Sequence, residues 1–344
     1  MKNYCIFELA ALAALTFASC SSESVEELGG GNQASQQVAI GFDGYLGRSA
    51  VDTRGSESDL PAIQAENVGF GVFGNYTASG SDVSYGSGLF KNQHVTYKTS
   101  NKTSKWEYTP IKYWPTAGHI DFLAYAPYVE QKTLSGTKFD FTVSSNVADQ
   151  TDLLWANATN QTKENNSGTN KVNFTFKHAL AKIGYSVKSK ENYSPATITV
   201  KSIKLVGDLA NENTKAFYTN GTIDLSKDNE APDLWTTASD DTKQNFTLLS
   251  SAQTLNTEYN PKDYLFVIPQ DFSGKTNNLY VVVEYTVKTT DNIEITNTVS
   301  QEITKDFKQG KAYMINLIIG LTPIEFEAKV ESWGPDNSED IELN

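Results

Sequence analysis

The feature that most restricts the fold of this chain is a two-residue alternation of apolar side chains that returns along its length. LYVVVEYTV (279–287) has an apolar residue at every second position, and KFDFTV (138–143) and VNFTF (172–176) repeat the pattern. Successive side chains of a strand point to opposite faces, so this period fits strands with one buried face. No stretch of useful length has the 3.6-residue period of an amphipathic helix, and the sequence therefore predicts an all-β protein.

Turn-forming residues separate these short segments, which is typical of β-sandwiches, and 344 residues are enough for two of them. We expect two tandem Greek-key sandwiches, at residues 38–160 and 161–344, because the longest polar stretch within the body is NATNQTKENNSGTN (157–170). The alternation changes phase before AKIGYSV (181–187), which predicts a bulge or tight turn near His178–Leu180.

The first residues are those of an export signal. The apolar run LAALAALTF (9–17) is too short to cross a bilayer, which disfavours a transmembrane helix. FASC follows and looks like a lipobox, which predicts a lipoprotein signal at 1–19 and a lipidated Cys20. A plain secretory signal cut near Ala18 is the alternative. The polar, glycine-containing residues 20–37 are predicted to be a flexible tether.

Cysteine usage and charge limit the remaining possibilities. Cys5 and Cys20 are the only cysteines, so an exported domain has no disulfide available and depends on apolar burial and strand pairing. Acyl chains on Cys20 would anchor the protein to a membrane without a spanning helix. The formal net charge of −13 repels phosphate backbones, which argues against a nucleic-acid partner.

All the arginine of the chain lies in one short stretch, YLGRSAVDTRGSESD (45–59), at Arg48 and Arg54. Chance clustering is one explanation. A cutting site for an arginine-specific protease is the other, and the Gly and Ser after Arg54 favour cleavage of the Arg54–Gly55 bond. The stretch follows a predicted strand, within 38–54, whose apolar face holds Val38, Ile40 and Phe42.

Two strands are predicted close to the C-terminal end. YMINLIIGL (313–321) is apolar nearly throughout, as a strand buried on both faces would be. IEFEAKVESW (324–333) alternates, with Ile324, Phe326, Ala328 and Val330 on its apolar face. From alternation alone, this is an ordinary strand of its own domain.

No pattern of residues indicates an enzyme, a metal site or a cofactor. GFGVFG (69–74) matches a dinucleotide-binding glycine pattern but is followed by turn-forming residues where that site needs a helix. His94, His119 and His178 lack metal-ligand spacing, and the acidic pairs lack calcium-site spacing. The five tryptophans fit a sandwich core better than a glycan-binding platform.

The order of several strings, from about Val38 to Trp333, resembles the fimbrillin family of type V pilus subunits. These strings are WEYTPIKYWP, IDFLAYAP, DLLWA, VNFTFKHALAKI, FKQGKAYMINLII and a final VESW. The resemblance implies two transthyretin-like β-sandwiches and export as a lipoprotein. It also implies that a trypsin-like, arginine-specific protease cuts in a loop after the first strand, and that a donor strand from another subunit takes the place of that strand.

Applied to this sequence, the resemblance makes Cys20 the lipidated residue and places the cut after Arg48 or Arg54. The departing strand would be 38–46, and the donor would come from residues 313–333. The expected partners are other fimbrial subunits, the protease, the outer membrane and a host protein or glycan. The alternatives are a monomeric surface lipoprotein that binds glycan or another host ligand, and a secreted hydrolase.

Overall fold

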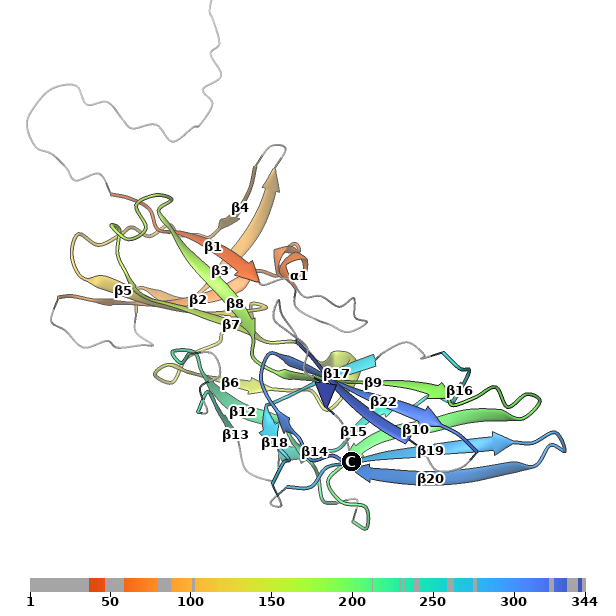
Figure 1. Ribbon diagram of the computed structural model, residues 1–344. Helices are drawn as coiled ribbons and strands as arrows, with labels where there is room; N and C mark the ends of the chain where they lie inside the picture. The colour runs from red at the N-terminus through yellow and green to blue at the C-terminus, as the bar shows by residue number, and fades with distance from the viewer. Residues whose placement is uncertain are drawn as a thin grey trace, which may run out of the picture. The chain divides into compact units, whose positions relative to one another are not determined.

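The structure is a computed structural model in which residues Val38–Asn344 form one compact unit (Figure 1). The residues described are 37–46, 59–79, 88–100, 103–211, 213–228, 231, 233–237, 242–258, 263–274, 277–321, 325–332 and 340–341. Strands dominate this part of the chain. Its helical elements are α1 (Leu60–Gln64), where the Asp59 side chain accepts the Ala62 N–H at 2.7 Å, and a 3-10 turn at Val147–Asp149. The all-β prediction is confirmed.

One seven-stranded sheet contains the N-terminal strands. Its order is β1 (Gly41–Leu46), β8 (Lys171–His178), β7 (Leu154–Gln161), β5 (His119–Ala126), β2 (Phe70–Thr77), β3 (Phe90–Ser100) and β4 (Thr103–Glu107). β1 runs parallel to β8, and all other neighbours are antiparallel. β1 is therefore an end strand of this sheet, beside β8 (Figure 1).

Two five-stranded sheets contain most of the C-terminal strands. The first has the order β15 (Phe246–Leu249), β10 (Thr197–Val206), β19 (Tyr280–Lys288) and β20 (Glu294–Glu302), with β16 (Gln253–Thr254) also on β10. The second has the order β17 (Asp263–Val267), β9 (Ala181–Ser189), β22 (Lys311–Ile319), β23 (Glu325–Ser332) and β24 (Asp340–Ile341). The inward alternation expected for 279–287 is confirmed, since Val281, Val283 and Tyr285 are buried.

Three smaller sheets complete the described strands. β13 (Trp235–Thr237) and β12 (Asn220–Asp224) pair with β6 (Lys138–Thr142), a strand from the first half of the chain. The two-stranded sheets are β11 (Phe217–Tyr218) with β14 (Lys243–Gln244), and β18 (Gln270–Asp271) with β21 (Asp306–Phe307). The pairing of β6 with β12 links the two halves of the chain through backbone hydrogen bonds.

The apolar core consists of two clusters that meet across the seven-stranded sheet. Ile120 and Phe122 of β5 belong to the N-terminal cluster, whereas Leu123 and Tyr125 belong to the C-terminal cluster. Because successive side chains of a strand point to opposite faces, β5 has a core on both sides, which explains why HIDFLAYA is apolar almost throughout. The N-terminal cluster thus lies on one face of β5 and the C-terminal cluster on the other.

The chain passes from the seven-stranded sheet to the next sheet at Ala179 and Leu180, both fully buried. The change of phase before AKIGYSV comes from this change of sheet, and not from a bulge within one strand. The polar stretch 162–170 is the turn between β7 and β8, which are neighbours in one sheet. We therefore propose a division between the halves near residue 179, with β8 in the N-terminal half.

Candidate functional site

The strongest candidate for a functional element is the edge strand β1 with the residues just before it. Six consecutive residues of β1 pair with β8, from Gly41 opposite Lys171 to Leu46 opposite Phe176. Upstream, Ile40 N–H donates to the Lys112 carbonyl at 2.8 Å, and Trp114 N–H donates to the Val38 carbonyl at 2.9 Å. Two different segments therefore hold 38–46 by its backbone.

The inward side chains of this segment lie in the N-terminal core. Ile40 and Phe42 are each 2% exposed, Leu46 is buried, and Val38 packs against the same cluster. The Phe42 ring contacts four other aromatic rings, at centroid distances of 5.3 to 5.7 Å, which belong to Phe90, Tyr108, Phe122 and Phe174. We call the space that β1 fills among these rings, beside β8, the β1 site.

Gly44 allows β1 to approach the sheet closely. A β-carbon at this position would lie 3.3 Å from Phe176 Cε2, 3.6 Å from Phe70 Cε1 and 3.7 Å from Trp106 Nε1. Since Trp106 belongs to β4, the last strand of the sheet curves round toward the first. The β1 site therefore has room for large side chains at Ile40, Phe42 and Leu46, but only for a very small one at Gly44.

The outward face of β1 is polar and accessible. Tyr45 is 58% exposed, and Asp43 forms an ion pair with Lys171 at 3.3 Å. Exposed ion pairs of this kind contribute little to stability, about 0 to 1 kcal/mol. The attachment of β1 thus rests on its backbone hydrogen bonds and on its inward apolar side chains.

Tyr108 ties the start of the segment to the core, because its phenol donates a hydrogen bond of 2.8 Å to the Ile40 carbonyl. Burial raises the pKa of this phenol, although the backbone hydrogen bond with Lys112 lowers it. The group therefore keeps its proton and stays a donor at neutral pH.

Replacing Tyr108 with Phe should loosen the start of β1, since one buried hydrogen bond contributes about 1 kcal/mol. Hydrogen exchange should show faster exchange of the Ile40 and Phe42 amides in this variant. Tyr125→Phe is the matched control, because its phenol oxygen lies within hydrogen-bond distance of Asn92 Oδ1 (2.7 Å) and the Val129 carbonyl (2.8 Å), away from β1. Burial also raises the pKa of Tyr125, to about 12. Equal effects of both variants on β1 would contradict this role of Tyr108.

The predicted cleavage and lipidation residues lie outside the part of the chain that the structure describes. Cys20 precedes residue 37, and Arg48 and Arg54 fall between the last residue of β1 and Asp59. β1 ends at Leu46, two positions before Arg48. The structure thus gives the strand on the N-terminal side of both arginines, and not the predicted sites themselves.

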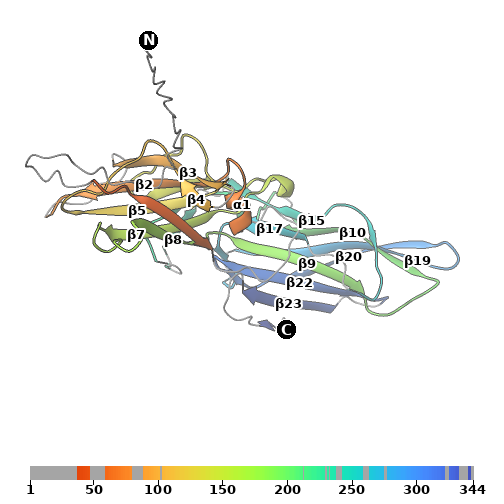
Figure 2. The same cartoon turned by 90° about the horizontal axis from the view of Figure 1, so that it is seen from above.

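The predicted donor residues Phe326, Ala328 and Val330 lie in β23, whereas Ile324 is outside the described residues. β23 pairs with β22 along its full length and on its other side has only the short β24 (Figure 2). β22 lies between β9 and β23 and has a buried run from Ala312 to Ile315, as its apolar sequence predicts. Within 313–333, β22 thus has a long strand on each side, whereas β23 has one long neighbour and one short one.

The three histidines and the GFGVFG string lie in different parts of the fold, each in contact with neighbouring side chains or backbone. His178 Nδ1 is 2.7 Å from Asp152 Oδ2 in the core, His119 Nε2 is 3.3 Å from Asp121 Oδ2, and the His94 ring stacks on Tyr128. The residues described contain no cluster of three or more His, Cys, Asp or Glu side chains that could hold a metal ion. All of GFGVFG except its first glycine lies in β2, where the Tyr125 ring would meet a β-carbon at Gly71.

Tryptophan side chains mostly belong to the core. Trp106, Trp114 and Trp155 are buried, and Trp235 is partly buried with its indole N–H donated to the Ala179 carbonyl at 2.8 Å. Trp333 lies outside the described residues. The four described tryptophans therefore form no exposed row of rings.

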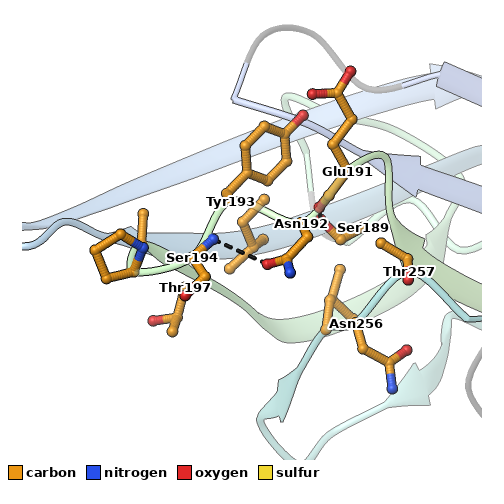
Figure 3. A pocket seen from close by; sticks show the side chains of 12 residues that line it. Ser189, Glu191, Asn192, Tyr193, Ser194, Thr197, Asn256 and Thr257 are labelled. Atoms are coloured by element: carbon orange, nitrogen blue, oxygen red, sulfur yellow. Dashed lines mark hydrogen bonds between the residues drawn. The ribbon is translucent and has the colours of Figure 1, made fainter.

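A shallow cavity of 260 Å³ lies where β9 ends and β10 begins. Its walls come from Ser189 and residues 191–198 and 255–257, with Asn192 Oδ1 accepting the Ser194 N–H at 3.0 Å (Figure 3). Glu191 is its one acidic side chain, and no histidine or cysteine lines it. The cavity thus lacks the pair of groups that acid–base or nucleophilic catalysis needs.

Within the described ranges, no helix is long and apolar enough to cross a membrane.

Comparison with known family models and solved structures finds fimbrial proteins in both cases. The model of the fimbrillin-like family matches residues 53–333. A crystal structure of a fimbrial protein from Bacteroides vulgatus is similar, with a TM-score of 0.66 and 24% identity over 86% of this chain and 99% of that chain. At this identity the likeness concerns the fold. No curated protein gives a significant match.

More distant structures include the tip fimbrial protein Mfa3 from Porphyromonas gingivalis, with a TM-score of 0.40 and 10% identity over 82% of this chain and 97% of that chain. Another is a fimbrial assembly protein from Parabacteroides distasonis, with a TM-score of 0.42 and 12% identity over 89% of this chain and 100% of that chain. The family match covers most of the chain. The chain therefore belongs to the fimbrillin-like family, and it is a structural subunit of a cell-surface fimbrium rather than an enzyme.

Proposed function

We propose that this fimbrial subunit is exported as a lipoprotein, is cut by an arginine-specific protease at Arg48 or Arg54, and then polymerises by strand exchange. The observation that carries the proposal is the position of β1. It is an edge strand that fills the β1 site, and the chain leads directly from it into the segment that contains every arginine. A cut after either arginine would leave β1 attached to its sheet only by non-covalent contacts.

Loss of β1 would create a binding site for another strand. It would expose one edge of β8 and the aromatic rings that contact Phe42. An unpaired edge next to apolar pockets accepts an extended peptide by β-augmentation, in which backbone hydrogen bonds give affinity and the pockets give specificity. In this proposal the donor is the region of Ile324, Phe326, Ala328 and Val330, since β23 is the outer long strand of its sheet.

Lipidation of Cys20 would link export to assembly. Acyl chains on this residue would hold the uncut subunit at the outer membrane. Stable anchoring needs more than one chain, because a single acyl chain gives only marginal binding. Cys20 lies on the N-terminal side of both arginines, so the cut that frees β1 also separates the body of the subunit from its lipid. Release from the membrane and opening of the β1 site would then be one event.

Digestion of the purified, uncut protein with an arginine-specific protease tests the proposal. We expect a fragment ending at Arg48 or Arg54, found by mass spectrometry, and a ladder of SDS-resistant multimers that appears as this fragment is lost. An arginine-specific enzyme is preferred because prolonged digestion with trypsin also cuts at the many lysines. A cut protein that keeps the fragment and remains monomeric would argue against exchange.

A monomeric lipoprotein that binds glycan is the less supported alternative. Such a function uses exposed aromatic rings as a platform, and the four described tryptophans lie in the core or partly buried. The shallow cavity near Tyr193 has polar walls, but its Asn192 side chain is already hydrogen-bonded within the loop.

A further inference from the structure

The apolar residues near β23 repeat those of β1 at the same spacing, with a small residue at the same place. In β1 and the residue before it they are Ile40, Phe42, Gly44 and Leu46; near β23 they are Ile324, Phe326, Ala328 and Val330. We infer that residues 324–330 from a second copy of this chain occupy the β1 site in this register, parallel to β8. The inference rests on the proposed strand exchange and adds the register, the direction and the identity of the partner.

Gly44 selects the register. A β-carbon there would lie 3.3 Å from the Phe176 ring, so alanine fits with a small shift of that ring and larger side chains clash. The proposed register places Ala328 at this position. A shift of two residues in either direction would place Phe326 or Val330 there, and neither side chain has room. One residue of the donor thus determines where the whole strand can lie.

Side-chain sizes select the direction. In the parallel register, Ile324 takes the place of Ile40, Phe326 that of Phe42, and Val330 that of Leu46. An antiparallel strand with Ala328 at the Gly44 position would put Val330 at the large Phe42 position and Phe326 at the Leu46 position. That arrangement would leave a cavity at one position and overfill the other, and both defects are costly in a close-packed core.

The backbone before β1 is also compatible. Its hydrogen bonds use the N–H of Ile40 and the carbonyl of Val38, and neither uses the N–H of Ala39. In the same register Pro323, which has no N–H, falls at the Ala39 position. The donor could therefore form both hydrogen bonds in spite of its proline.

The polar face of the donor matches the charges beside β1. Asp43 pairs with Lys171 at 3.3 Å, and Glu327 would take its place. Glu325 would replace Gly41, where a β-carbon lies 3.0 Å from Lys171 Cγ and 3.3 Å from the Asn170 carbonyl, so the Lys171 side chain has to shift to admit it. Lys329 would replace the exposed Tyr45. Since the apolar positions of the donor and the charge of Glu327 match this chain's own β1 site, the partner in this inference is a second copy of the chain.

Disulfide cross-linking tests the register. Tyr45 lies opposite Thr175 and Asp43 lies opposite Asn173 in the parallel pair, so Lys329 of the donor should lie opposite Thr175 of the acceptor. We expect chains carrying Lys329→Cys and Thr175→Cys to give covalent, reducible ladders after cleavage with an arginine-specific protease and mild oxidation. The matched control combines Lys329→Cys with Asn173→Cys, which is shifted by two residues. Cleavage also removes Cys5 and Cys20, so the polymer carries no other thiol.

The outcomes separate this inference from the proposed function. Covalent ladders with the Thr175 pair alone support the register. SDS-resistant ladders that show no covalent linkage with the Thr175 pair, or show it with the Asn173 pair instead, overturn the register and leave exchange standing. Absence of any ladder from the wild-type protein overturns the exchange itself and the register with it.

Ala328, the small residue of the donor, gives an independent test of the register. We expect Ala328→Leu to abolish the ladder, and Lys329→Leu, at the position equivalent to the exposed Tyr45, to leave it intact. Because Ala328→Leu leaves the β1 site unchanged, cut variant subunits should still accept wild-type donors and shorten the ladders of a mixture. Normal ladders from Ala328→Leu would overturn the register, and failure to shorten wild-type ladders would show that the variant had lost its fold.

Discussion

Replacing both arginines with alanine should prevent release of β1 and abolish polymer formation, while the chain folds as before. The chain contains no other arginine, so an arginine-specific protease has no further bond to cut. In the uncut subunit β1 stays linked to the body and has an enormous local concentration at its own site, so a donor strand from another subunit competes poorly. The measurement is the loss of SDS-resistant ladders from cells that express Arg48→Ala, Arg54→Ala.

Lysine provides a sharper control than alanine. Arg48→Lys, Arg54→Lys keeps both charges but removes both cutting sites for an arginine-specific protease, so it should also remain monomeric. Brief treatment with trypsin, which cuts after lysine, should restore assembly. The single replacements identify the bond, and we expect Arg54→Ala to have the larger effect. Fimbriae assembled by the double alanine variant would refute maturation at these residues.

Replacing Phe42 with Ala should strongly destabilise the uncut subunit and leave the polymer unaffected. Phe42 is almost fully buried among four aromatic rings, and truncation of such a side chain costs about 3–5 kcal/mol. The free energy of unfolding of the uncut chain, measured in urea, should fall by this amount. After exchange β1 is gone, so the thermal stability of the cut polymer should equal that of wild type.

Tyr45→Ala is the matched control for this comparison, because it lies on the same strand with 58% of its surface exposed. It should change the stability of the uncut chain by less than about 0.5 kcal/mol. If Phe42→Ala lowered the stability of the polymer as much as that of the monomer, β1 would still be present in the polymer, and another mode of association would have to operate.

Much of the fold follows from the sequence because alternation is a local property. The strict period of 279–287 predicts β19, and the apolar run 313–321 predicts an internal strand, as β22 is. Local patterns do not say which strands become neighbours. The polar stretch 157–170 predicts a domain boundary, yet it contains the end of β7 and the turn to β8, and these two strands are neighbours in one sheet. The phase change near His178 is a crossing between sheets, and alternation alone cannot distinguish a crossing from a bulge.

The β1 site, too, is only partly predictable from the sequence. The sequence identifies Val38, Ile40 and Phe42 as one face of a strand, and the arginine pair that follows it. It does not show that this strand lies at an edge, that it runs parallel to β8, or that Phe176 restricts the position of Gly44. The two sets of residues, 40–46 and 324–330, are both visible in the sequence, but their likeness gains meaning only when the space around each residue of β1 is known.

By itself, the sequence determined that this protein is built from strands, has no disulfide within its body, and carries all its arginine beside one amphipathic strand. These properties depend on residue types and on spacings of a few positions. The tertiary structure decided that β1 is an edge strand, that β22 lies between two long strands while β23 has only the short β24 beyond it, and that one glycine sets the shape of the β1 site. Those properties depend on contacts between segments far apart in the chain, whose pairing is decided by how their side chains pack together, and no local pattern encodes that packing.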